Sequence, residues 1–389
     1  MSVAKLLASS RIVVCVGSGG VGKTTIAAAL ALRAALDGRR TMVLTIDPAR
    51  RLAQSLGVGE LRAGGEEIAP ERFAEAGLAP KATLAAGMLD QTSAWDQFIA
   101  RHSPTAEVRD TILANPFYQN LSRSFAGSTE YMAIEELCRI EEGGRYDLIV
   151  LDTPPSRHAL DFLEAPRRLE DFFDRSVLGW LARPASAGWS AWKTASRGAR
   201  FVFERIEEAT GLQALTEIAS FFVAVEGLVD GVTERSRKVR ALLQDARTSF
   251  VLVTGPDEQV LEDAEGLVER MKDLGVSLRG VVMNRLQTSG AIDDPESLVR
   301  GRAFAAEPGD GPVARIAVAL RDAGVGAEVV EWMSRVLDAR LVQSAAQAVR
   351  REAFEAGLPP GLAVSAVAEQ KRDVHDLGSL ATIAGLLAG

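Results

Sequence analysis

The stretch VGSGGVGKTT at residues 16–25 decides the fold of this 389-residue chain. Residues 17–24 match the pattern G-x-x-x-x-G-K-[ST], which is typical of loops that bind phosphate groups. An apolar run at 12–16 precedes the loop and an alanine-rich stretch at 25–35 follows it, so the sequence predicts strand, loop and helix in the order that the motif requires. We therefore expect a nucleoside triphosphate as the ligand.

The residue types in this loop explain how it would hold a polyphosphate. Glycines let backbone N–H groups surround the phosphates, and the N-terminus of the following helix adds partial positive charge. Lys23 is expected to reach the outer phosphates, and the hydroxyl of Thr24 is expected to bind magnesium. The expected nucleotide contacts are Gly19, Gly20, Val21, Gly22, Lys23, Thr24 and Thr25. A glycine-rich turn without a ligand is the alternative, and the motifs farther along the chain argue against it.

Short apolar runs with many β-branched residues recur along the chain, mostly separated by helical periodicity, and this alternation predicts an α/β fold with a doubly wound, mostly parallel sheet. The expected strands lie at 12–16, 41–46, 84–89, 148–151, 250–253, 276–283 and 362–367. Between 160 and 244 the apolar residues follow helical spacing instead, as at Leu215, Ile218, Phe222, Val225, Val229 and Val232. We expect 160–244 to be a helical subdomain inserted into a phosphate-loop domain formed by 1–159 and 245–389. A smaller helical pair is expected at about 325–356.

Two of the predicted strands end in an aspartate, Asp47 and Asp152. Ligands of open α/β sheets bind at the carboxyl ends of the strands, so both carboxylates are expected to face the loop. We interpret Asp152 as a carboxylate that orders magnesium through bound water, and Asp47 as the residue that could polarise the attacking water. Each aspartate alone could instead cap the helix that follows it.

The motifs around these residues resemble those of the arsenite-pump-type ATPases, also called anion-transporting ATPases, a family that includes the ATPase that targets tail-anchored membrane proteins. The family's deviant phosphate loop GKGGVGKTT corresponds to 17–25, its first switch DPAxxL to 47–52, and its second switch DTxPxxHxLxFL to 152–163. Further matches lie at Asp90, at 127–130 and at 281–284. The resemblance implies a deviant phosphate-loop ATPase that uses ATP and magnesium and works as a dimer.

The resemblance also implies roles for individual residues. Asp47 would activate water, Asp152 would help to organise magnesium, and Asn284 would read the adenine ring, although an asparagine at a strand end can also cap a turn. The residues that fall in the two switches are Asp47, Pro48, Ala49, Asp152, Thr153, Pro154, Pro155 and His158. For His158 a packing role is the alternative to a switch role.

Ser18 departs from the family pattern, which has an additional lysine at this position. In the family that lysine reaches across the dimer interface and supplies positive charge to the partner's nucleotide, whereas serine donates a hydrogen bond but no charge. The chain most resembles a bacterial branch whose members often lack this lysine and work beside a lysine-bearing paralogue, which implies a heterodimer rather than a homodimer. We expect a switch ATPase, and the alternative is a regulatory or chaperone-like subunit that binds nucleotide with little hydrolysis of its own.

The composition narrows the classes of function further. The chain has a net charge of −8 and only two cysteines, Cys15 and Cys138, so a disulfide framework, an arsenite-binding thiolate site and a zinc or iron–sulfur cluster are not expected. We expect no nucleic-acid partner, no stable membrane insertion and a cytoplasmic location. The Trp- and Phe-rich helices within 160–244 are either internal core or a surface for a hydrophobic client.

Overall fold

The computed structural model describes residues 1–46, 51–59, 61, 64–89, 91–124, 128–153, 164–165, 167, 170, 218, 220–225, 228–287, 312–370 and 372–387. Eight strands form one sheet in the order β3-β4-β2-β5-β1-β6-β7-β8. They are β1 (Ile12–Val16), β2 (Thr41–Thr45), β3 (Glu66–Glu67), β4 (Leu84–Met88), β5 (Leu148–Asp152), β6 (Thr248–Thr254), β7 (Leu278–Leu286) and β8 (Ala363–Ala368). Neighbouring strands are parallel except for β3 and β4.

The predicted α/β fold with a mostly parallel sheet is confirmed. The seven predicted strands are all present, with ends that shift by a few residues. The sequence did not reveal β3, because its two exposed glutamates at the sheet edge carry no apolar pattern.

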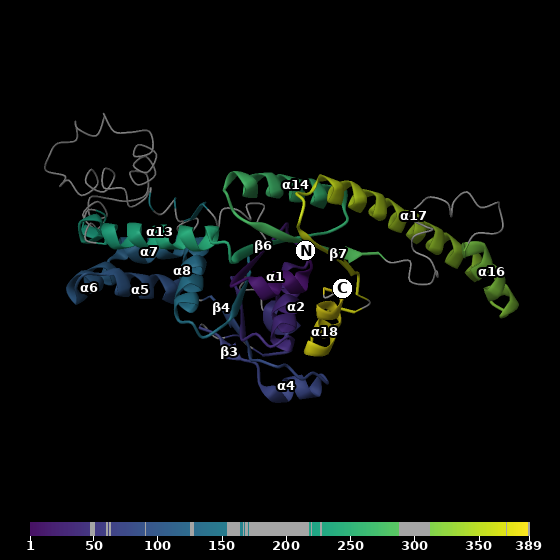
Figure 1. Ribbon diagram of the computed structural model, residues 1–389, viewed down its shortest axis with the longest axis horizontal. Coiled ribbons are helices and arrows are strands. Elements are labelled where there is room, and N and C mark those ends of the chain that lie inside the picture. The colour runs from purple at the N-terminus through teal and green to yellow at the C-terminus, as the bar shows by residue number, and fades with distance from the viewer. Residues whose placement is uncertain are drawn as a thin grey trace.

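Helices cover both faces of the sheet, as Figure 1 shows for α1, α2 and α18 on one side and α14 and α17 on the other. The first face packs against α1 (Val3–Ser9), α2 (Lys23–Leu36), α3 (Arg51–Ser55), α4 (Pro70–Glu75) and α18 (Leu377–Leu386). The second face packs against α14 (Glu258–Asp273) and the end of α17 (Ala327–Gly357). Successive side chains of β1 enter opposite cores, and because both faces are covered all five of its residues are buried.

A helical bundle extends the second core beyond the sheet (Figure 1). Its described helices are α5 (Gln91–His102), α6 (Ala106–Ala114), α7 (Pro116–Ser124), α8 (Ser128–Glu142) and α13 (Val229–Gln244). The Nε of Arg235 on α13 donates to the Oε2 of Glu135 on α8 at 2.7 Å, and only 3% of the Glu135 side chain is exposed. The described bundle therefore takes helices from chain segments on both sides of β5.

Most of the predicted insertion at 160–244 lies outside the described residues. Within the part that is described, the apolar positions that were expected on one helix face are buried, namely Ile218, Phe222, Val225, Val229 and Val232. The ring of Phe221 also packs edge to face against Phe117 of α7 and against Phe222. These described aromatic residues belong to the internal core.

The prediction of a helical pair at about 325–356 is wrong. One continuous helix, α17, spans 31 residues there, and its antiparallel partner is α16 (Pro312–Asp322), which comes earlier in the chain. No glycine or proline interrupts residues 327–356, so no residue in that stretch favours a break.

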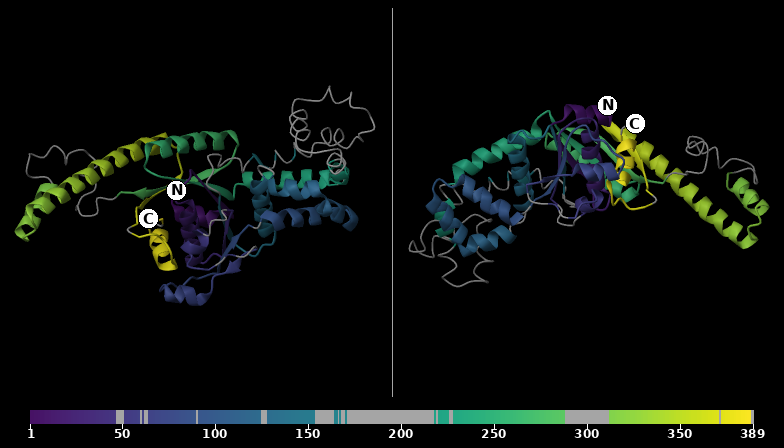
Figure 2. Two further views of the ribbon diagram at one scale, coloured as in Figure 1. Left: turned by 180° about the vertical axis from the view of Figure 1, so that it is seen from behind. Right: turned by 90° about the horizontal axis from the view of Figure 1, so that it is seen from below.

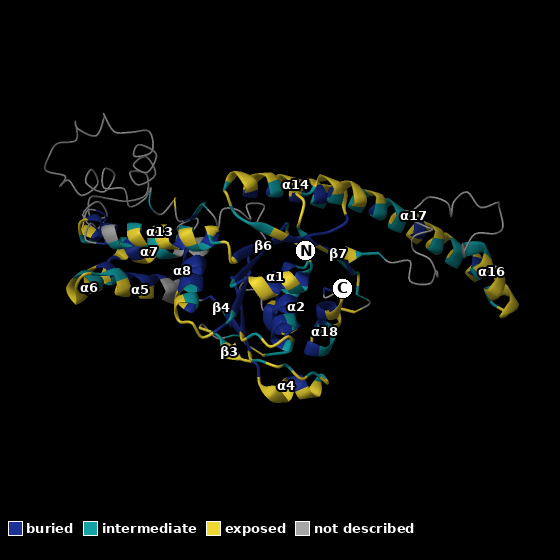
Figure 3. Ribbon diagram, viewed as in Figure 1, coloured by how far each residue is buried: buried dark blue, intermediate teal, exposed yellow. Residues whose placement is uncertain are grey.

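The N-terminal half of α17 projects beyond the sheet together with α16, as the two views of Figure 2 show. Gln287 follows β7, and its backbone N–H donates to the Oε1 of Gln347 on α17 at 2.9 Å. The projecting part carries mostly exposed and half-exposed residues (Figure 3), among them Val329, Trp332 and Val336. The C-terminal half of α17 is therefore attached to the end of β7.

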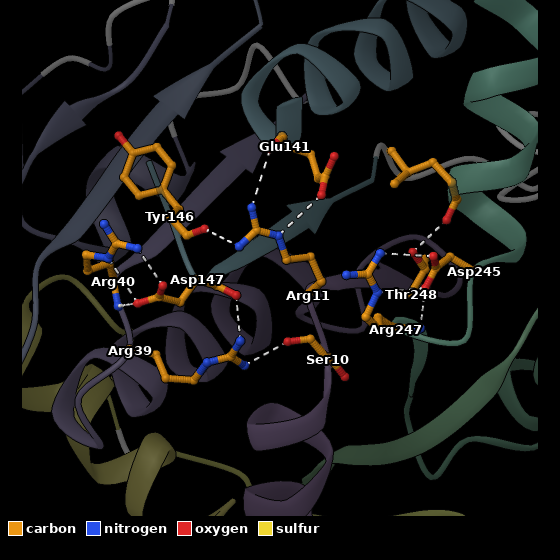
Figure 4. A network of polar contacts seen from close by, with 11 residues as sticks. Ser10, Arg11, Arg39, Arg40, Glu141, Tyr146, Asp147, Asp245, Arg247 and Thr248 are labelled. Atoms are coloured by element: carbon orange, nitrogen blue, oxygen red, sulfur yellow. Dashed lines mark hydrogen bonds and ion pairs between the residues drawn. The ribbon is translucent and has the colours of Figure 1, made fainter. Parts of the chain in front are cut away.

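Arginine side chains join the amino ends of the central strands (Figure 4). The guanidinium of Arg39 donates to the carbonyl oxygens of Leu7, of Ser10 at 2.8 Å and of Asp147 at 2.5 Å. Arg40 lies beside it and pairs with the Asp147 carboxylate in a more exposed position. Arg39 therefore links three chain segments that precede or connect β1, β2 and β5.

We expect Arg39→Met to lower the free energy of unfolding by about 2 kcal/mol, because several half-buried carbonyl oxygens lose a charged donor. Urea unfolding followed by circular dichroism would measure the change. Arg40→Met is the matched control and should have a much smaller effect, since its ion pair is solvent-exposed. Equal losses for the two variants would contradict this role of Arg39.

Candidate functional site

The phosphate-loop motif lies directly after β1 and takes a backbone path that only glycine accepts easily. Gly17, Gly20 and Gly22 have positive φ values of 153°, 80° and 89°. A Cβ added to Gly17 would lie 2.0 Å from the carbonyl oxygen of Val253 on β6, so the loop packs against the neighbouring strand without room for a side chain. Gly17 is thus required by its close packing against β6, in addition to any contact with phosphate.

Lys23 is the first residue of α2, and its side chain is only 5% exposed. Its Nζ donates to the carbonyl oxygens of Gly17 at 2.9 Å and Ser18 at 2.8 Å. The ammonium group therefore lies inside the curve of the loop, where a phosphate would need it. Ser18 and Thr24 are both half-exposed on the same loop.

Asp152 is fully buried at the carboxyl end of β5, next to β1. The Thr45 hydroxyl at the end of β2 donates to the Asp152 Oδ2 at 2.9 Å, and the next residue, Thr153, donates through its hydroxyl to the carbonyl oxygen of Cys15 at 2.7 Å. A buried carboxylate requires nearby polar or charged groups, and the hydrogen bond from Thr45 provides one of them. The hydrogen bond of Thr153 attaches the end of β5 to β1. In the register of β1 and β5, Asp152 lies opposite Cys15, which is two residues before Gly17.

Asn284 lies near the end of β7 and is 8% exposed. Its side-chain Nδ2 donates to the carbonyl oxygen of Val21 in the loop at 2.8 Å. The structure thus brings together the loop, Lys23, Asp152 and Asn284, which the sequence had singled out from separate segments.

Several predicted site residues lie outside the described residues: Asp47, Pro48, Ala49, Pro154, Pro155, His158 and Asp90. Thr45 was missed at the sequence level. A polar residue at the end of an otherwise apolar strand, two positions before Asp47, is the signal that could have drawn attention to it.

The donor set suits an oxygen-binding cation better than a soft metal. A carboxylate at Asp152, at the end of β5, and a hydroxyl at Thr24, in the first turn of α2, are the hard oxygen ligands that magnesium prefers. Cys15 and Cys138 are free and buried, and in the described part of the chain no cluster of histidine, cysteine and carboxylate residues could hold a metal. Burial, followed by the charge of Asp152, raises the pKa of the Cys15 thiol far above its usual range, so this thiol stays protonated.

Sequence comparison agrees with this geometry. The sequence model of the family described as anion-transporting ATPase matches residues 10–184, which include the loop, Asp47 and Asp152. Residues 10–184 are therefore similar in sequence to the anion-transporting ATPase family. The chain is thereby assigned an ATPase domain, and the predicted family resemblance is confirmed at that level.

Relatives from several eukaryotes extend the similarity beyond this segment. The chain is 27% identical over 272 residues to the ATPase GET3 of Malassezia globosa, which covers 70% of this chain and 71% of that protein. It is 26% identical over 280 residues to the ATPase ASNA1 homolog 2 of Paramecium tetraurelia, with 69% and 74% covered. For the ATPase GET3B of Arabidopsis thaliana the identity is 27% over 297 residues, with 71% and 64% covered.

In the described part of this chain no helix has the length and apolar character of a membrane span.

We expect Gly17→Ala to weaken ATP binding at least about tenfold, because its Cβ would collide with the Val253 carbonyl and displace the loop. Calorimetric titration with ATP and Mg²⁺ would measure the affinity. The matched control is Gly77→Ala, which also has a positive φ and meets no atom within 4 Å but lies after α4, outside the loop, so it should leave the affinity unchanged. Equal losses in the two variants would contradict a specific need for the contact between Gly17 and β6.

Both cysteines should resist thiol reagents in the folded protein. Burial raises the pKa of Cys138 to about 12 and raises that of Cys15 further, so neither forms an appreciable amount of thiolate at pH 8. Reaction with a disulfide reagent, followed by absorbance, should report almost no reactive thiol before denaturation and two per chain afterwards. Rapid labelling of the native chain would contradict the buried position of these thiols.

Proposed function

We propose that this chain is an ATP-binding and ATP-hydrolysing switch ATPase that works as a dimer and couples its nucleotide state to its helical bundle. The observation that carries the proposal is the juxtaposition of Lys23, inside a phosphate-loop motif, with the buried carboxylate of Asp152 one strand away. The family match supports ATP as the nucleotide. The chemistry is hydrolysis of ATP to ADP and phosphate.

In this proposal the loop residues Gly19, Gly20, Val21, Gly22, Lys23, Thr24 and Thr25 bind the phosphates. Thr24 would bind magnesium directly and Asp152 would hold it through water, and the bound ion would neutralise charge on the phosphates. Asp47 orients the attacking water, and the remaining switch residues report the state of the terminal phosphate. The buried, hydrogen-bonded position of Asp152 supports a positioning role for this carboxylate.

Ser18 is the reason to propose a second subunit. The Nζ of Lys23 is held by the carbonyl oxygens of Gly17 and Ser18, and Ser18 itself brings no charge to the half-exposed rim of the loop. By the family resemblance, a lysine from a partner would supply that charge in trans. We propose a lysine-bearing paralogue as this partner, with a homodimer as the second possibility.

The helical bundle is the element that we propose to respond to nucleotide. The segment 152–163, which resembles the second switch, leaves the sheet at Asp152, and the chain returns to β6 through α13. Arg235 of α13 is paired with the buried Glu135 of α8, so displacement of one helix would act on the other. We propose 160–244 as an inserted subdomain that contributes to this bundle.

A nucleotide-binding regulatory or chaperone-like subunit with little hydrolysis is the second candidate, and Ser18 is the observation that favours it. A hydrophobic client would then have to bind outside Phe117, Phe221 and Phe222, since these residues pack against one another in the core.

Two buried free thiols suit a reducing compartment, and we propose the cytoplasm as the location.

We expect a lysine supplied by a second chain to accelerate hydrolysis by this one. The S18K/K23A variant would carry a lysine at the variable position of the loop but lack the lysine needed at its own site. Excess S18K/K23A should raise phosphate release per wild-type chain at least about tenfold, because a cation delivered in trans stabilises charge in the transition state.

The matched control is S18A/K23A, which should leave the wild-type rate unchanged. Fast hydrolysis by the wild-type chain at dilutions where sedimentation shows only monomers would contradict the trans argument. Tight ATP binding without hydrolysis, even with S18K/K23A in excess, would favour the regulatory subunit.

A further inference from the structure

Asn284 has a contact that the adenine-reading role does not require. Its Nδ2 donates to the carbonyl oxygen of Val21 at 2.8 Å, between β7 and the phosphate loop. Because a carbonyl oxygen can only accept, this contact requires the amide nitrogen of Asn284, and not its oxygen, to face the loop. The side chain is 8% exposed, so the hydrogen bond is protected from solvent.

The peptide between Val21 and Gly22 transmits this contact to the phosphate site. In a planar trans peptide the C=O and the next N–H point in opposite directions. With the Val21 carbonyl directed at Asn284, the Gly22 N–H points away from Asn284. Gly22 caps α2, with its carbonyl accepting from the Ile26 N–H at 3.0 Å, and N–H groups at this position of a helix are donors to phosphate.

Gly22 also lies very close to the side chain of Asn284. A Cβ added to Gly22 would lie 2.3 Å from the Asn284 Nδ2. Gly22 is thus required both by its φ of 89° and by the amide that lies against it.

The strand is distorted where it presents this amide. Arg285 has a φ of 60°, and among the described residues it is the one non-glycine residue with positive φ. The register between β7 and β8 also shifts between Met283 and Leu286, which marks a bulge. Bulges re-aim side chains, and strain in a non-glycine residue persists where the surroundings hold it in place.

We propose that Asn284 is a positioning residue for phosphate binding: it fixes the Val21–Gly22 peptide so that the Gly22 N–H is presented to the phosphates, independently of any contact with the base. This inference rests on the proposed binding of ATP. It differs from base recognition in one measurable respect, since a positioning role affects ligands that have no base.

The test compares ATP with inorganic tripolyphosphate, which has the phosphates but no adenine, by calorimetric titration in the presence of Mg²⁺. Asn284→Ala and Asn284→Asp both remove the donor, and aspartate keeps nearly the same volume if alanine impairs folding. We expect each variant to bind tripolyphosphate about tenfold more weakly, as for a lost buried hydrogen bond, and to lose ATP affinity by a similar factor. Asn120→Ala, at an exposed position of α7, is the matched control and should leave both affinities unchanged.

The outcomes distinguish failure of the positioning role of Asn284 from failure of the proposed ATP binding. If ATP affinity falls in the Asn284 variants while tripolyphosphate affinity stays at the wild-type value, Asn284 acts on the base only and the positioning role is overturned. A lower melting temperature with both affinities unchanged would also overturn it, since the residue would then be structural. If the wild-type chain binds neither ATP nor tripolyphosphate, the proposed function itself fails.

Discussion

The close approach of the phosphate loop to two neighbouring strands is the constraint on which the rest of the structure depends. Gly17 leaves no space for a Cβ against the Val253 carbonyl of β6, and Gly22 leaves none against Asn284 of β7. The loop is therefore held at its start and at its end by strands that come more than 200 residues later in the chain. Its conformation depends on the assembled sheet, because the short motif alone contains only one side of each contact.

Electrostatics at the same edge of the sheet explain why a cation is expected with the nucleotide. Asp152 is fully buried, and the pKa of the neighbouring Cys15 thiol responds to the negative charge of Asp152 in one direction and to Lys23 in the other. Opposite charges thus lie on adjacent segments in a region of low dielectric, where interactions between charges are strong. A triphosphate placed beside Asp152 would be repelled unless a cation lay between them, so magnesium and ATP belong together in this proposal.

The sequence predicted most of the sheet because the central strands β1, β2, β5 and β6 are short, mostly apolar runs that are buried on both faces. It also singled out Lys23 and Asp152 as candidate site residues, since both belong to local motifs whose order along the chain carries information. The contact between Asn284 and Val21 could not be predicted, because it depends on a strand order in which β7 is two strands from β1, and on a bulge at Arg285. The error over 325–356 has a different cause: a projecting helix has less tertiary packing, and its apolar spacing does not show whether it is one helix or two.

Ser18 makes the proposed heterodimer asymmetric. A lysine carried by the paralogue would reach toward the nucleotide on this chain, whereas the nucleotide on the paralogue would face Ser18, which has no charge to offer. In this proposal each subunit's hydrolysis would depend on the loop of the other, so Ser18 would slow hydrolysis at the partner's site while this chain's own site would still receive a lysine. The serine-bearing subunit would then be the one that hydrolyses ATP, and the lysine-bearing subunit would be its activator. A homodimer of this chain would lack the charge at both sites and would correspond to the regulatory alternative.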